Sequence, residues 1–399
     1  MLPIADRFDS AYDGCDVLYG RGRTADLGDY LADRGVDGAL VVCGPNVGTN
    51  DALMEPIRAG LGDRHARTFD GTTPEKRAET AFDLLEAAAT ADADALVAVG
   101  GGSSLDVARQ ASVIAADGRD LAALESEARG GSIDSPIADP AFPVVAIPTT
   151  FAGADLSAGG SLEVLSADAS PTGQPLTVSG SAMPVADLLD PDLFETTPRS
   201  VLAGSAMNGF DKGIETVYAR DASPVSDATA VHGIRLLSGS LPVVAGDRAG
   251  DAAAAMDRAV AGTLLVQIDR KISVVHAFGH GFARRYDVQQ GAIHAVVVPH
   301  VLAYLFEEVD AGRRALAAGL GIDAEGRDDD AVAEAVVDAV ASVRDALPVP
   351  NRLRDVDVVR EDDLPAIAEF IAEDPPMERA PAGIDASPER IEGVLRGAW

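Results

Sequence analysis

Residues 276–294, HAFGHGFARRYDVQQGAIH, hold three of the six histidines in this 399-residue chain. His276 and His280 are four residues apart, a spacing that places both imidazoles on one face of a helix. Neutral imidazole is the commonest nitrogen ligand of a divalent metal, and a histidine near its ordinary pKa also transfers protons. The stretch could therefore hold a catalytic metal, or keep the shell of such a site without the ion.

The composition excludes some partners. Asp and Glu number 64 against 32 Lys and Arg, for a net charge of −32, which disfavours nucleic acid and anionic membranes. The acidic residues are spread along the chain, which indicates an acidic globular surface rather than a disordered tail. Only three lysines occur, Lys76, Lys212 and Lys271. This composition is typical of proteins from organisms that keep molar salt in their cytoplasm. We therefore predict a halophilic protein whose fold loosens without salt.

The chain shows no sign of export or membrane insertion. The start, MLPIADRFDS, has neither the basic nor the apolar region of a signal peptide, and no apolar run reaches the ~18–20 residues that span a bilayer. The two cysteines, Cys15 and Cys43, do not make a disulfide framework. We therefore expect a cytoplasmic protein without membrane contact.

The hydrophobic pattern predicts two domains. Apolar runs at 38–44, 95–100 and 142–148 read as buried strands, and 74–92 reads as a helix between two of them, which favours a parallel sheet with helices on both faces. Residues 158–181 read as short strands and loops. Beyond the prolines of 188–198 we predict only helices, at 201–218, 224–240, 250–286, 292–306, 311–319, 330–346 and in shorter segments to the end. The prediction is an α/β dinucleotide-binding domain over 1–190 and an all-helical domain over 191–399.

Two predicted strand ends could form a cofactor site. VAVGGGSSLDVARQ follows one strand and opens a helix, whose first N–H groups could bind an anion. Ser103 and Ser104 could cap that helix. The third strand delivers Thr149 and Thr150 at its carboxyl end, the edge at which ligands bind in open α/β sheets. Each signal alone could be an ordinary turn, but together they favour a cofactor crevice.

Five ordered motifs carry a resemblance to a known family: GGGSSLD, IPTTFAGADLS, LLDPDLF, AMNGFDKGIETVYA and HAFGH followed by QQGAIHAVVVPHV. The chain resembles the iron-containing alcohol dehydrogenase family over nearly its whole length. It is most similar to the maleylacetate reductases, through FAGADLS, Asn208, His294 and the ending APAGIDASPERIEGVLRGAW. The resemblance implies the dehydroquinate synthase-like fold of that family, with the active site between the two domains, hydride transfer with NAD(P)H and a homo-oligomer.

The resemblance also implies which residues bind the cofactor. By position, Gly101, Gly102, Ser103 and Asp106 would cradle the pyrophosphate, and Thr149, Thr150 and Ser157 would line the adenosine and nicotinamide path. Gly44 stands where many relatives carry an Asp that binds the ribose and repels a 2′-phosphate. We therefore expect NADPH to be tolerated as well as NADH.

At the family's metal positions the chain departs from the pattern. The resemblance maps the four ligands onto Asn208, Lys212, His276 and Gln290. Only His276 is a good ligand, and a lysine ammonium has three donors and no acceptor. A slip in the alignment could recover Asp211 or His294. We predict that no metal is held.

The catalytic residues that we predict are Lys212, His276 and His280. An ammonium in place of the ion could stabilise the enolate or alkoxide formed on hydride transfer, or donate a proton, although Lys212 could equally be a solvated helix lysine. His280 matches a family histidine that relays a proton near the nicotinamide, and His276 could bind substrate. Arg284 and Arg285 could pair with a substrate carboxylate, or merely offset acidic neighbours.

The resulting hypothesis is a metal-independent, NAD(P)H-dependent reductase of a small carbonyl or enone, such as the carboxylate maleylacetate. A metal-dependent short-chain alcohol dehydrogenase is the first alternative, and a catalytically inactive NAD(P)-binding protein is another. A non-redox enzyme like dehydroquinate synthase is disfavoured because it uses the same missing ligands.

Overall fold

A computed structural model describes residue 8 and residues 14–399, which divide into two compact units. The first contains residues 14–150 and 154–197, and the second contains 151–153 and 198–399. The domain boundary predicted from the sequence lies between residues 190 and 191. None of the helices in the described part of the chain is long and apolar enough to cross a membrane.

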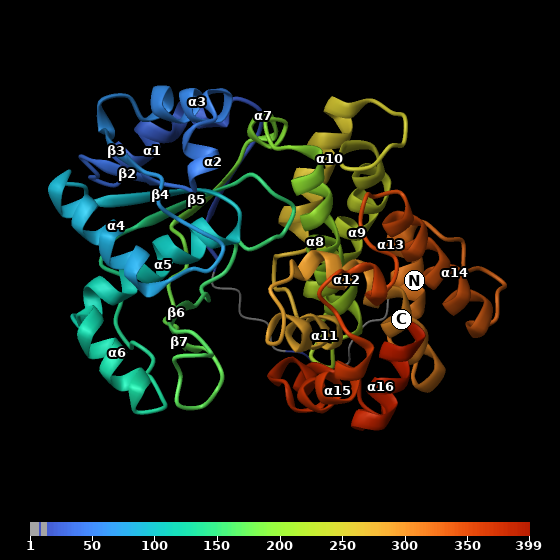
Figure 1. Cartoon of the computed structure of the whole chain (residues 1–399). Helices are drawn as coiled ribbons and strands as arrows, with labels where there is room; N and C mark the ends of the chain where they lie inside the picture. The colour runs from blue at the N-terminus through green and yellow to red at the C-terminus, as the bar shows by residue number, and fades with distance from the viewer. Residues whose placement is uncertain (1–7, 9–13) are drawn as a thin grey trace. The chain divides into compact units, whose positions relative to one another are not determined.

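The first unit contains a parallel sheet, as predicted, and this sheet has six strands (Figure 1). The strand order is β1-β8-β5-β4-β2-β3, and every pairing within it is parallel. The strands are β1 (Asp16–Tyr19), β2 (Ala39–Val42), β3 (His65–Phe69), β4 (Ala95–Gly100), β5 (Val144–Pro148) and β8 (Ala186–Leu189). The three apolar runs that were predicted to be buried strands form β2, β4 and β5, and all residues of these strands are buried.

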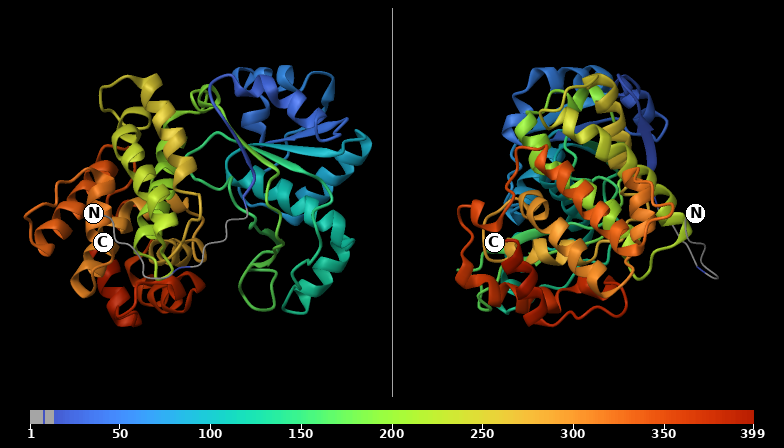
Figure 2. Two further views of the ribbon diagram at one scale, coloured as in Figure 1. Left: turned by 180° about the vertical axis from the view of Figure 1, so that it is seen from behind. Right: turned by 90° about the vertical axis from the view of Figure 1, so that its right-hand side faces the viewer.

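Helices cover both faces of this sheet (Figure 2). Leu27, Ile57 and Leu193 pack with one set of strand side chains, and Ala81, Leu84 and Leu124 pack with the opposite set. The helices are α1 (Leu27–Ala32), α2 (Pro45–Gly48), α3 (Asp51–Leu61), α4 (Ala78–Thr90), α5 (Gly102–Asp117), α6 (Leu121–Arg129) and α7 (Pro191–Phe194). The glycine-rich 158–181 region forms an antiparallel pair, β6 (Leu162–Leu165) and β7 (Leu176–Val178), as expected.

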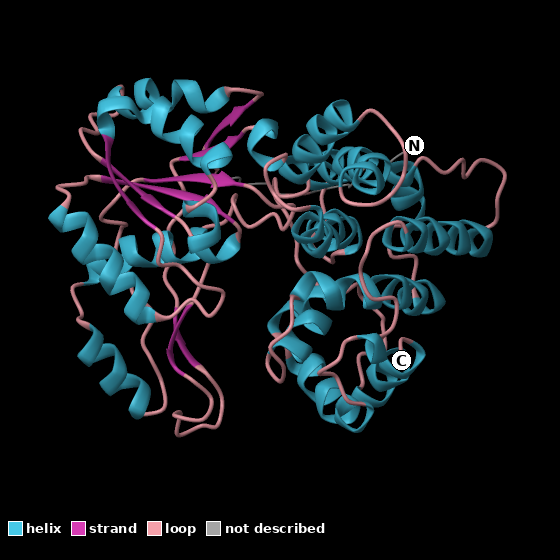
Figure 3. Cartoon of the chain, turned by 45° about the horizontal axis from the view of Figure 1, so that its top comes forward, coloured by secondary structure: helices cyan, strands magenta, loops and turns pink. Residues whose placement is uncertain are grey.

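In the described part of the second unit the regular elements are all helical (Figure 3). They are α8 (Arg199–Tyr218), α9 (Pro224–Val244), α10 (Ala252–Leu265), α11 (Val274–Ala283), α12 (Gln290–Glu308), α13 (Arg313–Leu320), α14 (Asp329–Asp345), α15 (Leu364–Glu373) and α16 (Pro388–Gly397). The single helix predicted over 250–286 is wrong, because the chain leaves α10 at Leu265 and re-enters a helix only at Val274. Asp269, with a positive φ of 52°, lies in that interruption.

The short segment Phe151–Gly153 leaves the sheet and packs on α8. Gly209 permits this approach, because a Cβ there would lie 2.0 Å from the carbonyl oxygen of Phe151. The main-chain N–H of Phe151 donates to the hydroxyl of Ser205, one turn earlier on α8. This contact places the carbonyl of Ala152 beside the middle of α8, where Lys212 lies.

A buried carboxylate in the sheet gives a prediction about stability. Asp187 on β8 is fully buried, and burial and the carboxylate of Asp155 raise its pKa well above the ordinary 3.8. A raised folded-state pKa means that the stability contributed by this group is fully present below about 3.9 and is lost as pH rises through the folded value. Asparagine has the same shape without the charge.

We therefore expect Asp187→Asn to raise the free energy of unfolding by about 1–3 kcal/mol at alkaline pH. Denaturant unfolding across a pH series would measure the change. The gain should shrink as the medium is acidified, because Asp187 is then neutral in the native protein as well. An unchanged gain at every pH, or a loss at alkaline pH, would contradict this account.

Candidate active site

The glycine-rich loop forms the start of a helix at the carboxyl end of β4. Gly100, the last strand residue, has a φ of +127°, a conformation that glycine adopts without strain. Gly101 is the N-cap of α5, and no side chain caps its first turn. The leading N–H groups of a sixteen-residue helix are thus left for an anion, and the helix dipole favours negative charge there. A cofactor pyrophosphate fits this position.

The second strand end lies directly beside this loop. Thr149, buried after β5, donates its main-chain N–H to the carbonyl of Gly100 at 3.1 Å. The Thr150 side chain lies 3.6 Å from the position that a Cβ at Gly101 would take. Ser104 is held by a hydrogen bond of 2.8 Å with the hydroxyl of Thr72. The structure therefore brings the loop and the threonine pair together at one edge of the sheet.

Asp106 and Ser157, two other predicted cofactor residues, belong to one polar network. The Asp106 carboxylate pairs with Lys76 Nζ at 3.0 Å and with the guanidinium of Arg109. Arg109 is 1% exposed and donates to the carbonyls of Ala154 at 2.8 Å and Ser157 at 2.9 Å. In this position Asp106 orients an arginine that holds the 154–157 turn. Direct contact of Asp106 with a phosphate stays a prediction.

Asp70 lies at the carboxyl edge of the sheet near Gly44, where the sequence analysis identified no carboxylate. Gly44, the N-cap of α2, carries no side chain at the end of β2, as expected. Asp70 follows the neighbouring strand β3, and its Oδ2 lies 3.5 Å from the position that a Cβ at Gly48 would take. A carboxylate at this edge can accept a hydrogen bond from an adenosine ribose and repel a 2′-phosphate.

In the helical unit, Lys212 on α8 is buried, with 6% of its surface exposed. Its ammonium donates to the carbonyl of Ala152 and, at 2.9 Å, to Oδ1 of Asn208 one turn earlier. Lys212 is therefore held in place, and the reading of it as a solvated helix lysine is wrong. The charge also lies close enough to His276 to lower the pKa of that imidazole, after the larger effect of burial.

His276 on α11 is oriented by a carboxylate that the sequence did not single out. Its Nδ1 bonds to Glu215 of α8, and its main-chain N–H donates to the same carboxylate at 3.0 Å. Burial raises the pKa of Glu215 to about 7, and burial holds the pKa of His276 well below its usual range. His276 is then a neutral imidazole, and the tautomer whose Nδ1–H donates to an ionised Glu215 leaves Nε2 as an acceptor.

His280, one turn after His276, is oriented in the same way. Its Nδ1 lies 2.7 Å from Oδ2 of the buried Asp374, which follows α15. About a third of the His280 side chain, 34%, is exposed to solvent. The two imidazoles meet edge to face with their centroids 6.4 Å apart. His280 can therefore exchange protons with solvent while remaining close to His276.

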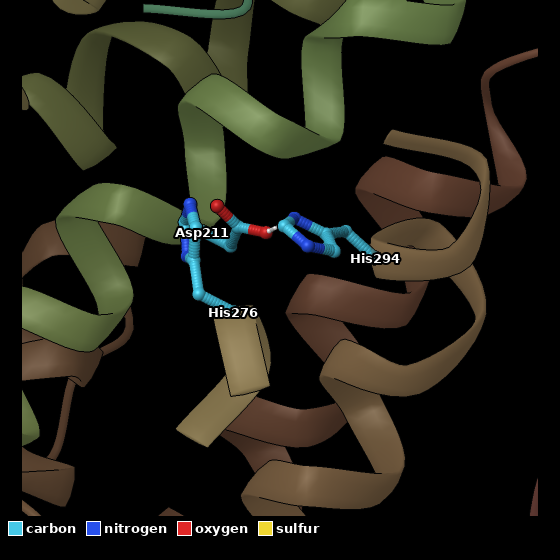
Figure 4. Close-up of side chains that lie close together, drawn as sticks. All are labelled: Asp211, His276 and His294. Carbon is cyan, nitrogen blue, oxygen red and sulfur yellow. Dashed lines mark ion pairs between the residues drawn. The ribbon is translucent and has the colours of Figure 1, made fainter. Parts of the chain in front are cut away.

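Three side chains form a cluster that could hold a metal ion: Asp211, His276 and His294 (Figure 4). Each offers one ligand atom, and these atoms lie within 4.8 Å of one another. Asp211 of α8 and His294 of α12 form an ion pair and are fully enclosed. None of their carboxylate oxygens and ring nitrogens has a partner of hydrogen-bond geometry among the described residues. Two imidazoles and one carboxylate are a suitable donor set for a divalent transition metal.

The four positions mapped from the family do not fit a metal, whereas the neighbouring cluster does. At the mapped positions an ammonium already bonds to Asn208, and this positive charge opposes a cation. Asp211 and His294, which sequence reasoning allowed only as a slip in alignment, lie three residues after Asn208 and four after Gln290. Each is thus one helical turn further along the same helix. An ion there would be held by Asp211, His276 and His294 and could act as a Lewis acid.

Comparison with known proteins places the chain among dehydrogenases and reductases. The family model "Iron-containing alcohol dehydrogenase" matches residues 15–188, and "Fe-containing alcohol dehydrogenase family, C-terminal" matches residues 202–399. Lactaldehyde reductase of Escherichia coli K12 is 27% identical over 394 residues, covering 96% of this chain and 97% of that protein. Maleylacetate reductase 2 of Cupriavidus pinatubonensis is 30% identical over 315 residues, covering 78% and 77%.

A solved structure confirms the fold. Sulfoacetaldehyde reductase of Bifidobacterium kashiwanohense, in complex with NAD⁺, superposes with a TM-score of 0.81 over 99% of both chains, at 16% sequence identity.

Proposed function

Because the chain belongs to the iron-containing alcohol dehydrogenase family and is an oxidoreductase, we propose that it uses NAD(P)H to reduce a small carbonyl or enone compound. The relatives include reductases of lactaldehyde and of maleylacetate. The observation that carries the proposal is the buried ammonium of Lys212 close to the Glu215–His276 pair, together with His280, which meets His276 and is oriented by Asp374. We further propose that the reaction needs no metal.

The cofactor assignment is supported by the uncapped start of α5 and the threonine pair beside it. The family relative with NAD⁺ bound has the same fold. The cofactor supplies a hydride, and Gly101, Gly102 and Thr150 of this chain would hold its phosphates at the helix start. Asp70 adds support for NADH as the better cofactor.

Lys212 supplies the charge that the reaction needs. Hydride addition to a carbonyl carbon leaves an alkoxide, and addition to an enone leaves an enolate, so negative charge develops on oxygen in both cases. An ammonium fixed by Asn208 and Ala152 stabilises that oxygen without reorganising, and can donate a proton to it. His276 accepts a hydrogen bond at Nε2 and orients the substrate. His280, partly open to solvent, returns the proton to this site.

A metal-dependent alcohol dehydrogenase is the second candidate, because Asp211, His276 and His294 could hold an ion. The enclosure of Asp211 and His294 argues against it as a catalytic site, since a catalytic metal keeps a coordination position open to substrate. A bound ion at this cluster would therefore serve structure more readily than catalysis.

The test is oxidation of NADH and NADPH with an aldehyde series and with maleylacetate, in about 1 M KCl, before and after treatment with a strong chelator. We expect turnover to survive the chelator and metal analysis to find less than one ion per chain. Loss of turnover that Fe²⁺ or Zn²⁺ restores would establish the metal-dependent candidate instead. Cofactor binding without turnover on any substrate would leave an inactive NAD(P)-binding protein.

A further inference from the structure

A cavity of about 620 Å³ opens in the helical unit beside His280. Three arginines from separate segments line it: Arg220 just after α8, Arg284 at the end of α11, and Arg379 after α15. Its volume is in the range of pockets that bind small organic ligands. The cavity therefore combines a predicted catalytic histidine with three guanidinium groups, in a chain whose net charge is −32.

Three carboxylates, Asp221, Asp374 and Glu378, also line the cavity, so its formal charge is balanced, but not every arginine is ion-paired. Asp374 is engaged by His280 at 2.7 Å, and Asp221 by Arg379 at 3.3 Å. Glu378 is exposed to solvent. Arg220 and Arg284 form no ion pair within residues 14–399. Both side chains are exposed, and each guanidinium group contacts a neighbouring residue.

The Nε of Arg220 donates to the carbonyl of Ala380 at 3.2 Å. The guanidinium carbon of Arg284 lies 5.1 Å from the centroid of the Phe370 ring. These contacts hold the two guanidinium groups at the cavity wall, and their terminal N–H groups form no ion pair within residues 14–399. A pair of fixed guanidiniums is suited to a carboxylate, which they bind through paired hydrogen bonds.

We propose that Arg284 and Arg220 bind a carboxylate of the substrate, so that this enzyme reduces small oxo acids or unsaturated oxo acids in preference to neutral aldehydes. The inference rests on the proposed function, because it takes His280 and Lys212 as the groups that meet the reducible carbonyl. The proposal also gives different roles to two adjacent arginines. Arg285, the neighbour of Arg284, is ion-paired with Asp363 and is not among the residues that line the cavity.

The kinetic test compares 4-oxobutanoate with its methyl ester, which has nearly the same shape and no charge. In Arg284→Met we expect KM for 4-oxobutanoate to rise about 10- to 100-fold, with KM for the ester and kcat for both little changed. Arg220→Met should act in the same direction. Arg285→Met removes an adjacent charge of the same kind outside the cavity and is the matched control. About 1 M KCl screens non-specific attraction between charges.

A binding measurement separates failure of this inference from failure of the proposed reaction. We expect calorimetry to show that succinate binds the intact protein, and that Arg284→Met but not Arg285→Met weakens it about 10-fold or more. Succinate binding of this kind without turnover of either aldehyde would uphold the carboxylate site and overturn the reaction. Equal succinate affinity in Arg284→Met and Arg285→Met would overturn the site. Tighter, Arg284-dependent binding of inorganic phosphate than of succinate would overturn the carboxylate assignment.

Discussion

Lys212→Met should lower kcat by about 10²- to 10³-fold at saturating NAD(P)H, the loss typical of removing one group that stabilises a developing oxyanion. Methionine keeps an unbranched side chain of similar length and removes only the charge and its donors. KM for the carbonyl substrate should change less than kcat, because the stabilised charge exists fully only in the transition state. Steady-state kinetics together with a cofactor titration would measure the effect.

Lys271→Met is the matched control for this change. Lys271 lies in the same unit and its Nζ pairs with Asp269 at 2.6 Å, so the variant loses the same charge from a partly buried ion pair. Lys212→Met also deprives Asn208 and Ala152 of a donor, which can cost about 1–3 kcal/mol of stability, so both variants need a thermal unfolding curve. An unchanged kcat in a folded Lys212→Met protein would rule out the role of Lys212.

The sequence was most informative where burial is continuous. The strands β2, β4 and β5 are buried over their whole length, and such apolar runs are distinctive of parallel sheets. The edge strands β1 and β3 are half exposed, and their residues DVLY and HARTF carry no such pattern. They are strands because neighbouring strands supply hydrogen bonds, a tertiary cause that local composition does not reveal.

The site shows the same division between local and non-local causes. The spacing of His276 and His280 and the glycine-rich loop are local features, so both were recognisable in the sequence. Glu215 and Asp374, which orient the two histidines, lie 61 and 94 residues away from their partners. With 64 acidic residues in the chain, nothing but helix packing selects these two.

The residues mapped from the family and the residues that could hold a metal differ by one helical turn. Spacing along the chain gives the face of a helix that a residue occupies, and Asn208 and Asp211 are close to the same face of α8. Which turn of α8 meets α11 and α12 depends on how the helices pack. In the structure, Asp211 lies against His294 of α12, and Lys212 bonds to Asn208. Asp211, a member of the possible metal cluster, and Lys212, the fixed ammonium, are thus consecutive residues. The chelator experiment decides whether catalysis depends on a metal held by Asp211 or on the ammonium of Lys212.

Gly101→Asp should weaken NAD(P)H binding about 100-fold while leaving the fold intact. The backbone at Gly101 has φ −87° and ψ −178°, an extended conformation open to any residue, and a Cβ would meet Thr150 at an ordinary 3.6 Å. Aspartate is also a favoured N-cap, so the melting temperature should stay the same or rise. The new carboxylate would however occupy the start of α5, where the proposed site receives a doubly charged pyrophosphate.

Gly101→Asn isolates the charge from the bulk in this experiment, because asparagine has the same shape and caps a helix equally well. We expect the asparagine variant to lose much less affinity than the aspartate variant in a fluorescence titration with NADH. If both lose affinity equally, the side chain acts by filling space, and the site remains at the helix start. If neither loses affinity, the start of α5 does not bind the cofactor phosphates. The proposed cofactor site would then have to be sought at another strand end of the sheet.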